Sequence, residues 1–503
     1  MNEEENAEIR ETIQSNESEN LIRDTGLTNI EKIVDEEENK EQNNIIKKNN
    51  SISTIFSIAN SIVGTSIMTL PYNVYKTGII PAIIITIIYD LISFYTCKIY
   101  VDYGTKDNDF SLTIEKYFKK FFGQKISKIG KTIQIFFTTF MATGGFITYF
   151  IIMAQNFYPI VCLLLKIMGV EIDSNDLTPE FTRFSSVYLG LINCIILFPL
   201  CIRKDISCLV FLSSFGCYFI NILIIYLIYT GIDSIVNNDF KFEYIKNKDN
   251  SEERYLYLLG VNPALLAGTL SMGFFCHTAI LPILKSNKNQ DKNIRDLLLG
   301  FCFVGFVYGT CGILGYIGFS GKEFKSDFKD NWLMFFDSEN YLILVFKAVM
   351  VFHLITAFPI LSLIVRIQSL TFFFGSEYPG KKHVIICVLI QLFLCLIIFY
   401  FFYNNLAQLL SVFGACASFI LVYAFPPTVK MIDYYLNKKG INLNEENYDL
   451  DNDENNEENN KKVKFNFKDI LFFIGHFFFV LIGIANVVFQ FVPINFFNIT
   501  IKD

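Results

Sequence analysis

Histidine and charged side chains are scarce in this chain. Only four of its 503 residues are histidine, and Asp, Glu, Lys and Arg make up 18%, below the roughly 25% that is usual for soluble domains. No histidine has the spacing of a metal ligand, and no HExxH-like or His/Asp/Ser cluster is present. No basic patch suggests a nucleic acid. We therefore expect neither an enzyme, nor a metalloprotein, nor a nucleic-acid-binding protein.

Cysteine is present, but it is not placed for crosslinking loops. All twelve cysteines fall in or beside apolar segments, and none lies in the middle of a long polar loop. This placement favours cysteine as a small buried hydrophobe over cysteine in disulfides.

Long apolar runs dominate the remaining composition. The chain is 52% hydrophobic, contains 54 Phe and has a mean hydropathy of +0.39. Its apolar residues gather in runs of about 20, the length that crosses the hydrocarbon core of a lipid bilayer. We predict an all-α, multi-pass membrane protein with eleven spanning helices, at about 52–74, 79–101, 132–165, 186–202, 206–230, 263–284, 297–319, 341–373, 383–403, 407–427 and 468–493.

Two polar segments lie outside these runs. Residues 1–49 are rich in Glu and Asn, and residues 442–464 in Asn, Glu and Asp. Such compositions bury too little apolar surface to become ordered, so we expect disorder in both. The predicted domains are a cytoplasmic tail at 1–49, available to a soluble partner, and a transmembrane domain at 50–503. The tail has no apolar core of a cleavable signal peptide, so we expect the first spanning helix to direct insertion.

Loop charges predict the orientation. With the N-terminus inside, the short inner loops carry the lysines and arginines, as the positive-inside rule requires. The opposite loops mix signs or lean acidic. We expect a monomer in the plasma membrane or a vacuolar or lysosomal membrane, with its N-terminus cytoplasmic. The inner-loop cations are Lys106, Lys116, Lys119, Lys120, Lys125, Lys128, Arg203, Lys204, Lys285, Lys288, Lys292, Arg295, Lys381 and Lys382.

A polar interruption divides the first apolar run. Asn60-Ser61-Ile62-Val63-Gly64-Thr65-Ser66 lies at membrane depth, and Pro71 follows it. In a bilayer, irregular backbone persists only where it lines a cavity or is buried in protein, and a helix interrupted by Gly and Pro indicates a transporter binding site. The alternative is a helix whose small residues pack against a neighbour.

The sixth run contains a second interruption, from Gly268 to His277. Two interrupted helices at matching positions predict an inverted repeat of helices 1–5 and 6–10, with helix 11 as an addition and the binding site at the membrane midplane.

Two broken helices are suited to the backbone of an amino acid. Free N–H groups at a helix start carry partial positive charge and suit a carboxylate, whereas free carbonyl groups suit an ammonium group. We expect the first helix to bind the carboxylate, and the sixth to face the amino group and the side chain. The predicted substrate-binding residues are Ser61, Ile62, Val63, Gly64, Thr65 and Ser66, with Leu270, Ser271, Met272, Gly273 and Phe274.

These motifs resemble a known family. The pattern Asn-x-x-x-Gly-Thr-Ser-x-x-x-x-Pro, from Asn60 to Pro71, is similar to the amino acid/auxin permease family, and within it to the sodium-coupled neutral amino acid transporter branch. Residues 274–277, 284–288 and 293–297 resemble a lysosomal, arginine-sensing member of that branch. The resemblance covers about residues 50–500. It implies a LeuT-like fold and secondary transport of amino acids by alternating access.

The resemblance also implies a cation site. The family's sodium site is similar to what Asn60 and Thr356 would form here, and sodium is the only cofactor we expect. The structural alternatives are that Asn60 caps the helix break and that Thr356 bonds to its own helix. Coupling to protons stays open, because Asp90 in the second helix is either a proton site or a partner for Lys347.

Two functions remain open at this point. One is cation-coupled amino acid transport. The other is an amino acid sensor that signals to a soluble partner through residues 1–49.

Overall fold

A computed structural model describes residues 49–104, 110–170, 179, 184–203, 207–238, 240–245, 255–320, 329–336, 340–441, 443 and 465–492. The predictions of disorder at 1–49 and 442–464 fall almost wholly outside these residues. Asn49 is described, and its backbone bonds to the backbone of Ser286 and Lys288, directly after the sixth predicted span.

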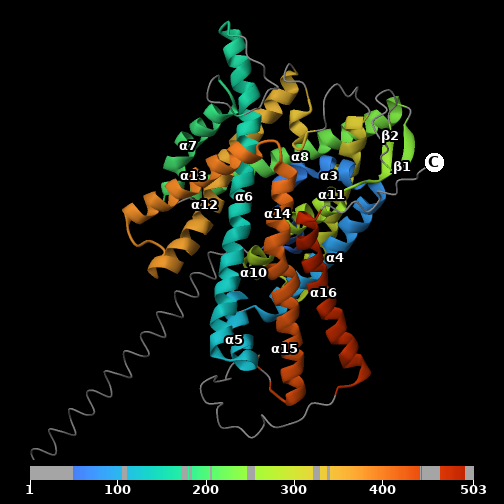
Figure 1. The fold of residues 1–503 in the computed structure, drawn as a ribbon, viewed down its shortest axis with the longest axis vertical. Coiled ribbons are helices and arrows are strands. Elements are labelled where there is room, and N and C mark those ends of the chain that lie inside the picture. The colour runs from blue at the N-terminus through green and yellow to red at the C-terminus, as the bar shows by residue number, and fades with distance from the viewer. Residues whose placement is uncertain are drawn as a thin grey trace, which may run out of the picture.

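Helices account for nearly all of the described chain. An apolar run in lipid must satisfy its own backbone groups, which an α-helix does within one segment. The helices are α2 (Ser51–Ile62), α3 (Leu70–Thr77), α4 (Ile79–Tyr103), α5 (Phe110–Phe122), α6 (Gln124–Ile167), α7 (Ser186–Ile202), α8 (Ser207–Asn237), α9 (Pro263–Gly273), α10 (His277–Lys285), α11 (Asn293–Ser320), α12 (Tyr341–Phe374), α13 (Lys381–Phe402), α14 (Leu406–Ser418), α15 (Phe425–Lys439) and α16 (Phe467–Phe491) (Figure 1).

The predicted multi-pass helical architecture is confirmed. Within the described residues, nine helical spans are long and apolar enough to cross a membrane, and α2 and α7 are shorter apolar helices. Helices α2 and α3 together form the first predicted span, and α9 and α10 the sixth. The count of eleven crossings stays a prediction.

Two elements outside the long apolar runs were not predicted. Helix α5 is amphipathic and buries Ile114, Tyr117 and Phe118 against its neighbours. Strands β1 (Lys241–Ile245) and β2 (Tyr255–Leu259) pair in parallel, with Lys241 opposite Tyr255, so the fold is not purely helical. A search for runs of spanning length does not detect elements as short as these.

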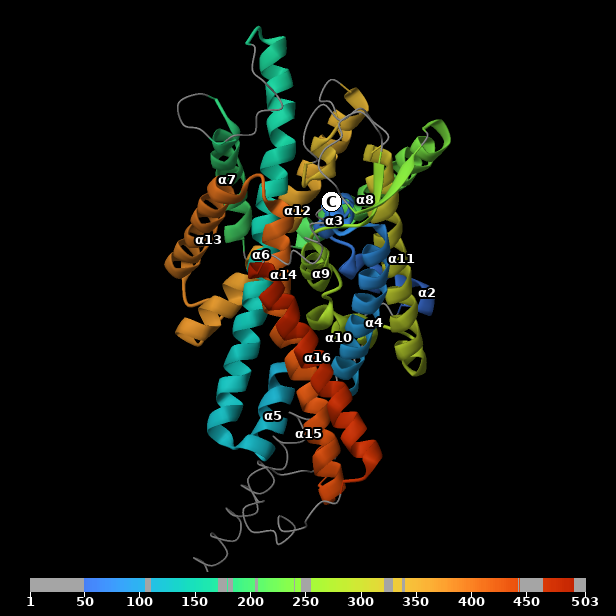
Figure 2. The ribbon, with the colours of Figure 1, turned by 45° about the vertical axis from the view of Figure 1, so that its right-hand side comes forward.

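The helices form two groups that α8 and α14 join (Figures 1 and 2). Helix α8 packs against α11 and α12, which belong to different groups. The interrupted helices α2–α3 and α9–α10 pack with α4 and α11, whereas α6, α7, α12 and α13 pack with one another. Helix α14 packs against both α9 and α6. A Cβ on Gly144 of α6 would lie 2.6 Å from the Phe413 ring of α14, so a glycine allows this close approach.

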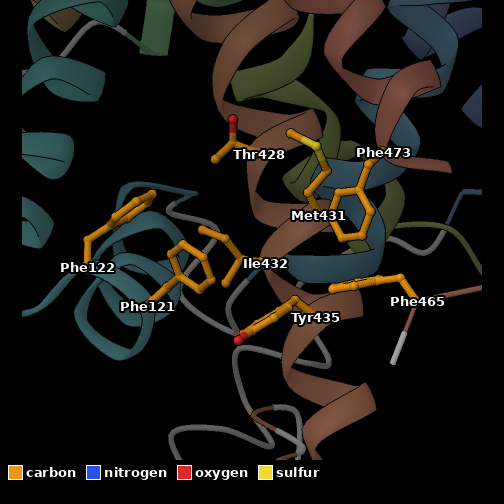
Figure 3. Close-up of a pocket in the computed structure, with 8 residues that line it drawn as sticks. All are labelled: Phe121, Phe122, Thr428, Met431, Ile432, Tyr435, Phe465 and Phe473. Atoms are coloured by element: carbon orange, nitrogen blue, oxygen red, sulfur yellow. The ribbon is translucent and has the colours of Figure 1, made fainter. Parts of the chain in front are cut away.

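An apolar cavity of about 380 Å³ lies at the α5 end of the molecule, between α5, α15 and the start of α16 (Figure 3). Aromatic rings form most of its wall, including Phe121, Tyr435 and Phe473. None of the predicted binding residues lines it.

Candidate functional site

The first span is interrupted as predicted. Helix α2 ends at Ile62, Gly64 is extended (φ −131°, ψ −158°), and a short 3-10 helix, η1 (Thr65–Met68), precedes α3. Pro71 lies in the first turn of α3, where its missing N–H costs no hydrogen bond. The amides of Thr65 and Ser66 begin η1, so the preceding turn provides no carbonyl for them.

The sixth span is interrupted at the expected place as well. Helix α9 ends at Gly273 and α10 begins at His277. The ring of Phe274 is fully buried in the break, with its centroid 5.2 Å from that of Tyr308.

The two breaks lie against each other. A Cβ on Gly273 would be 3.1 Å from the Ser66 hydroxyl and 3.1 Å from the Tyr308 ring, so this position favours glycine. The alternative for the first span, a regular helix whose small residues pack against a neighbour, is wrong because α2 ends at Ile62 and η1 separates it from α3.

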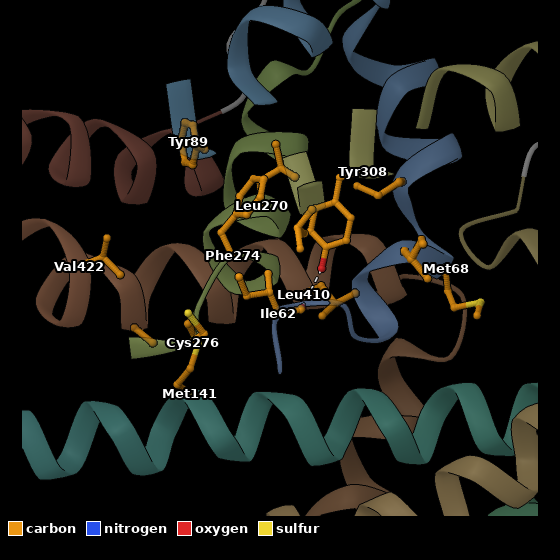
Figure 4. Close-up of a cluster of buried hydrophobic side chains, with 14 of the residues drawn as sticks. Ile62, Met68, Tyr89, Met141, Leu270, Phe274, Cys276, Tyr308, Leu410 and Val422 are labelled. Atoms are coloured by element: carbon orange, nitrogen blue, oxygen red, sulfur yellow. Dashed lines mark hydrogen bonds between the residues drawn. The ribbon is translucent and has the colours of Figure 1, made fainter. Parts of the chain in front are cut away.

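Tyr308 of α11 links the two breaks, and sequence reasoning missed it. Its hydroxyl lies 2.9 Å from the carbonyl oxygen of Ile62 (Figure 4). It also lies 3.3 Å from the carbonyl oxygen of Gly273 and 3.0 Å from the Ser66 hydroxyl. The sequence signal was the series Gly305, Gly312 and Gly315 around it, which lets α11 approach α3 and α4 closely.

The Tyr308 hydroxyl cannot satisfy all of these neighbours. It has one proton, so at any moment it donates to one carbonyl only. No other hydrogen bond to the Ile62 or Gly273 carbonyl oxygen occurs within the part of the chain that the structure describes. One carbonyl at the joined breaks is therefore always left without a donor.

Gly64 faces open space. The nearest atom to a Cβ built on Gly64 is its own neighbour's carbonyl oxygen, on Ile62, at 3.9 Å. Asn60 and Ser61 are exposed on the last turn of α2, Val63 is half-buried, and the Ser61 hydroxyl bonds to the Ile58 carbonyl. The extended backbone at Gly64 thus borders unfilled volume, while Ile62, Thr65 and Ser66 are buried beside it.

Ser271 of the sixth predicted span is directed away from the two breaks. The Ser271 hydroxyl contacts the Tyr423 hydroxyl (3.2 Å) and accepts a bond from the Asn486 amide (2.9 Å), which directs it toward the tenth and eleventh predicted spans. Leu270 is buried in the core, and Met272 is half-buried. The structure thus joins the first break to Gly273 and Phe274 rather than to Ser271.

Tyr423 belongs to a third irregular segment, the π-helix η4 (Phe419–Ala424). Wide turns of this kind are frequent at functional sites. Pro426 and Pro427 have no N–H to donate back to the carbonyls of Val422 and Tyr423, and this pair of prolines was the sequence signal for the irregularity.

The predicted sodium ligands are not joined by a hydrogen bond. The Thr356 hydroxyl donates to the carbonyl of His353 in its own helix, at 2.8 Å, and Asn60 is exposed. Asp90 is buried against Gly305 of α11, and Lys347 is buried on α12. Whether Asp90 is a proton site or a partner for Lys347 stays open.

A close backbone contact joins α9 to α14. A Cβ on Gly268 of α9 would lie 2.3 Å from the Ser411 carbonyl oxygen of α14, and one on Gly414 would lie 2.2 Å from the Gly268 carbonyl oxygen. We call this contact the α9–α14 seam.

Beyond the seam, Asp330 lies between the two helix groups. Its carboxylate accepts the Ala407 N–H at 3.0 Å. Burial raises the pKa of Asp330 to about 6, although the Ala407 N–H, the Lys76 charge and the Tyr72 hydroxyl each lower it in part.

This shift predicts a pH-dependent stability. The folded protein holds the Asp330 proton more tightly than the unfolded chain, so the free energy of unfolding should fall as pH rises from about 4 to about 6. We expect Asp330→Asn to remove about 1 kcal/mol of this fall, after allowance for solvent screening. Thermal unfolding in detergent at pH 4 to 7 measures it. Parallel stability curves for the two proteins would contradict it.

Two interrupted spans that meet at the centre of a multi-pass helical protein define the class of LeuT-fold transporters. The fold matches the structure titled "Inward facing conformation of Mhp1" with a TM-score of 0.52, over 88% of this chain and 91% of that chain, at 11% identity.

The chain belongs to the transmembrane amino acid transporter family, whose family model matches residues 47–449. The predicted family, and with it the function in transmembrane transport of amino acids, is confirmed. The sensor alternative receives no support.

The protein named "Neutral amino acid transporter 9" of Danio rerio is 25% identical over 432 residues, which are 76% of this chain and 75% of that protein. The "Sodium-coupled neutral amino acid transporter 9 homolog" of Caenorhabditis elegans is 25% identical over 78% of this chain and 69% of its own.

Proposed function

We propose that the joined helix breaks bind the backbone of a neutral α-amino acid during transport. The amides of Thr65 and Ser66 face the substrate carboxylate. The carbonyls of Ile62 and Gly273 face its ammonium group. The single observation that carries this proposal is the Tyr308 hydroxyl, which has one proton for two carbonyls and so leaves an acceptor for the substrate.

A neutral side chain suits the surroundings of the site. The predicted binding residues of the two breaks include no acidic or basic side chain, and the buried residues Phe274 and Leu270 are apolar. Both curated relatives described above carry "neutral amino acid transporter" in their names. A charged substrate side chain would lose its hydration there without gaining a partner.

Transport proceeds by alternating access, in which the α2–α3, α4, α9–α10 and α11 group moves against the α6, α7, α12 and α13 group. The α9–α14 seam supports a state that is closed toward the β1–β2 end. Helix α2 packs mainly against α10 and α11, within its own group. We place the N-terminus in the cytoplasm on the loop charges, and we propose a monomer in the plasma membrane or a vacuolar or lysosomal membrane.

A cation drives the uptake. Sodium would bind the side-chain oxygens of Asn60 and Thr356 after the Thr356 hydroxyl turns from the His353 carbonyl. A proton would bind Asp90, whose buried Oδ1 has no hydrogen-bond partner. Uptake into proteoliposomes under a sodium gradient or a pH gradient separates the two. Loss of sodium stimulation in Thr356→Ala supports the first site, and loss of proton stimulation in Asp90→Asn supports the second.

Substitution of Gly64 tests the carboxylate site. The extended backbone at Gly64 accommodates a β-branched residue, and the new side chain would occupy the open space beside the amides. We expect Gly64→Val to reduce uptake at least tenfold and Gly64→Ala to reduce it less, with thermal stability unchanged in both. Uptake by Gly64→Val equal to that of the parent protein would overturn the proposed function.

A further inference from the structure

A second cavity, of about 290 Å³ and lined in part by polar side chains, lies at the β1–β2 end of the molecule. We call it the outer chamber. Its wall includes Tyr72 and Lys76 of α3, Asn262 at the start of α9, Asp330, Gln408 of α14 and Gln490 of α16. The volume is at the lower end of the range for small-molecule sites. The chamber adjoins the α9–α14 seam, since the Gln490 side chain bonds to both Ser411 and Ala264.

The outer chamber brings together one positive and one negative charge from different parts of the fold. The Lys76 ammonium lies over the rings of Tyr72 and Tyr75, 5.3 and 5.4 Å from their centroids. The Asp330 carboxylate belongs to the connection between α11 and α12, and it is close enough to Lys76 for the lysine charge to lower its pKa.

Polar side chains with free capacity complete the wall. Gln408 and Asn405 are both exposed toward the cavity, and neither side chain forms a hydrogen bond within the part of the chain that the structure describes. The Asn262 side chain is occupied, because it accepts the Leu265 N–H at the start of α9. The chamber therefore offers a cation, an anion and amide groups to a small ligand.

We propose that the outer chamber is a second binding site for a free α-amino acid, with Lys76 facing the carboxylate and Asp330 facing the ammonium group. The ligand class depends on the proposed function, amino acid transport. A zwitterion suits this pair because it offers an opposite charge to each of the two side chains. Both charges, on Lys76 and on Asp330, therefore stay compensated when the ligand lies between them.

Lys76 connects the outer chamber to both broken helices. Its carbonyl accepts the Asn262 N–H at 3.0 Å, and the Thr77 carbonyl accepts the Gly260 N–H at 2.8 Å. The end of α3 and the start of α9 are thereby joined by backbone bonds. A ligand that displaces Lys76 would therefore move α3 and α9 together. Both helix ends lie on the side of the α9–α14 seam that must open to admit substrate.

The stoichiometry of binding tests the outer chamber. The purified full chain is titrated by equilibrium dialysis with a ¹⁴C-labelled mixture of the protein amino acids. We expect two molecules bound per chain. Lys76→Met and Gln408→Trp should each weaken the binding of one of these two molecules at least tenfold. Lys76→Met removes a charge, and Gln408→Trp fills the chamber. Lys381→Met, at an exposed helix start on the opposite side of the fold, is the matched control and should retain both.

The outcomes separate this site from the helix breaks. A single bound molecule that Gly64→Val removes and Lys76→Met and Gln408→Trp leave intact would overturn the outer chamber and keep the proposed function. A single bound molecule that only the two chamber variants remove would overturn the proposed site at the breaks and support the chamber. Absence of binding in the folded parent protein would overturn both.

Discussion

Tyr308→Phe is expected to lower amino acid uptake by about 10- to 100-fold while the protein still folds. The substitution removes the hydroxyl that reaches the Ile62 carbonyl, the Gly273 carbonyl and Ser66, and it keeps the ring that packs on Phe274. An unsatisfied buried acceptor costs about 1–3 kcal/mol, and 1.4 kcal/mol corresponds to a tenfold change. Initial rates of uptake into proteoliposomes measure the loss.

A tyrosine on the same helix provides the control. The Tyr316 hydroxyl is buried and accepts the Tyr257 N–H at 2.9 Å, far along α11 from the breaks. Tyr316→Phe should cost a similar amount of stability and leave uptake within about twofold, because it removes one hydrogen bond of ordinary strength. Equal uptake losses in the two variants would mean that Tyr308 acts through folding alone.

Gly268→Ala is expected to abolish net uptake by opening the α9–α14 seam. The added Cβ would lie 2.2 Å from the Ser411 hydroxyl and 2.3 Å from its backbone carbonyl, so rotation of the serine side chain cannot relieve the clash. Helix α9 must move away from α14, which disfavours the state closed toward the β1–β2 end. A single cysteine introduced at Gln408 should become several-fold more reactive toward a membrane-impermeant maleimide in this variant.

Gly309→Ala on α11 is the matched control for Gly268→Ala. Nothing lies within 4 Å of a Cβ at Gly309, and alanine is favoured over glycine inside a helix by about 1 kcal/mol. This variant should transport normally. If Gly268→Ala also transported normally, the seam would not be part of the transport cycle.

The helix breaks were predictable because their chemistry is local. A run of Asn, Ser, Gly and Thr closed by Pro71 does not form a regular span, and the structure places an extended Gly64 there. The pairing of the first and sixth spans followed from their positions in the two halves. Such patterns do not predict the direction in which each side chain points. Ser271 was therefore expected in the substrate pocket, but it bonds to Tyr423 and Asn486.

The residues that join the breaks could not be found in the same way. Tyr308 lies in an otherwise ordinary apolar run, and its role depends on three hydrogen-bond partners that are 35 to 246 residues away along the chain. The outer chamber likewise combines Lys76 with Asp330, which lies outside every predicted span. Contacts over such separations arise from helix packing, which periodicity and composition do not encode.

The central claim is that the joined breaks recognise the amino acid backbone. It is tested most directly by competition for uptake of the ¹⁴C-labelled amino acid mixture into proteoliposomes. The competitors are the best-transported neutral amino acid, its N-acetyl derivative and its carboxamide. Each derivative lacks one of the two charges for which the breaks provide partners. The account predicts that only the free amino acid competes, with both derivatives at least tenfold weaker. Equal competition by either derivative would contradict it.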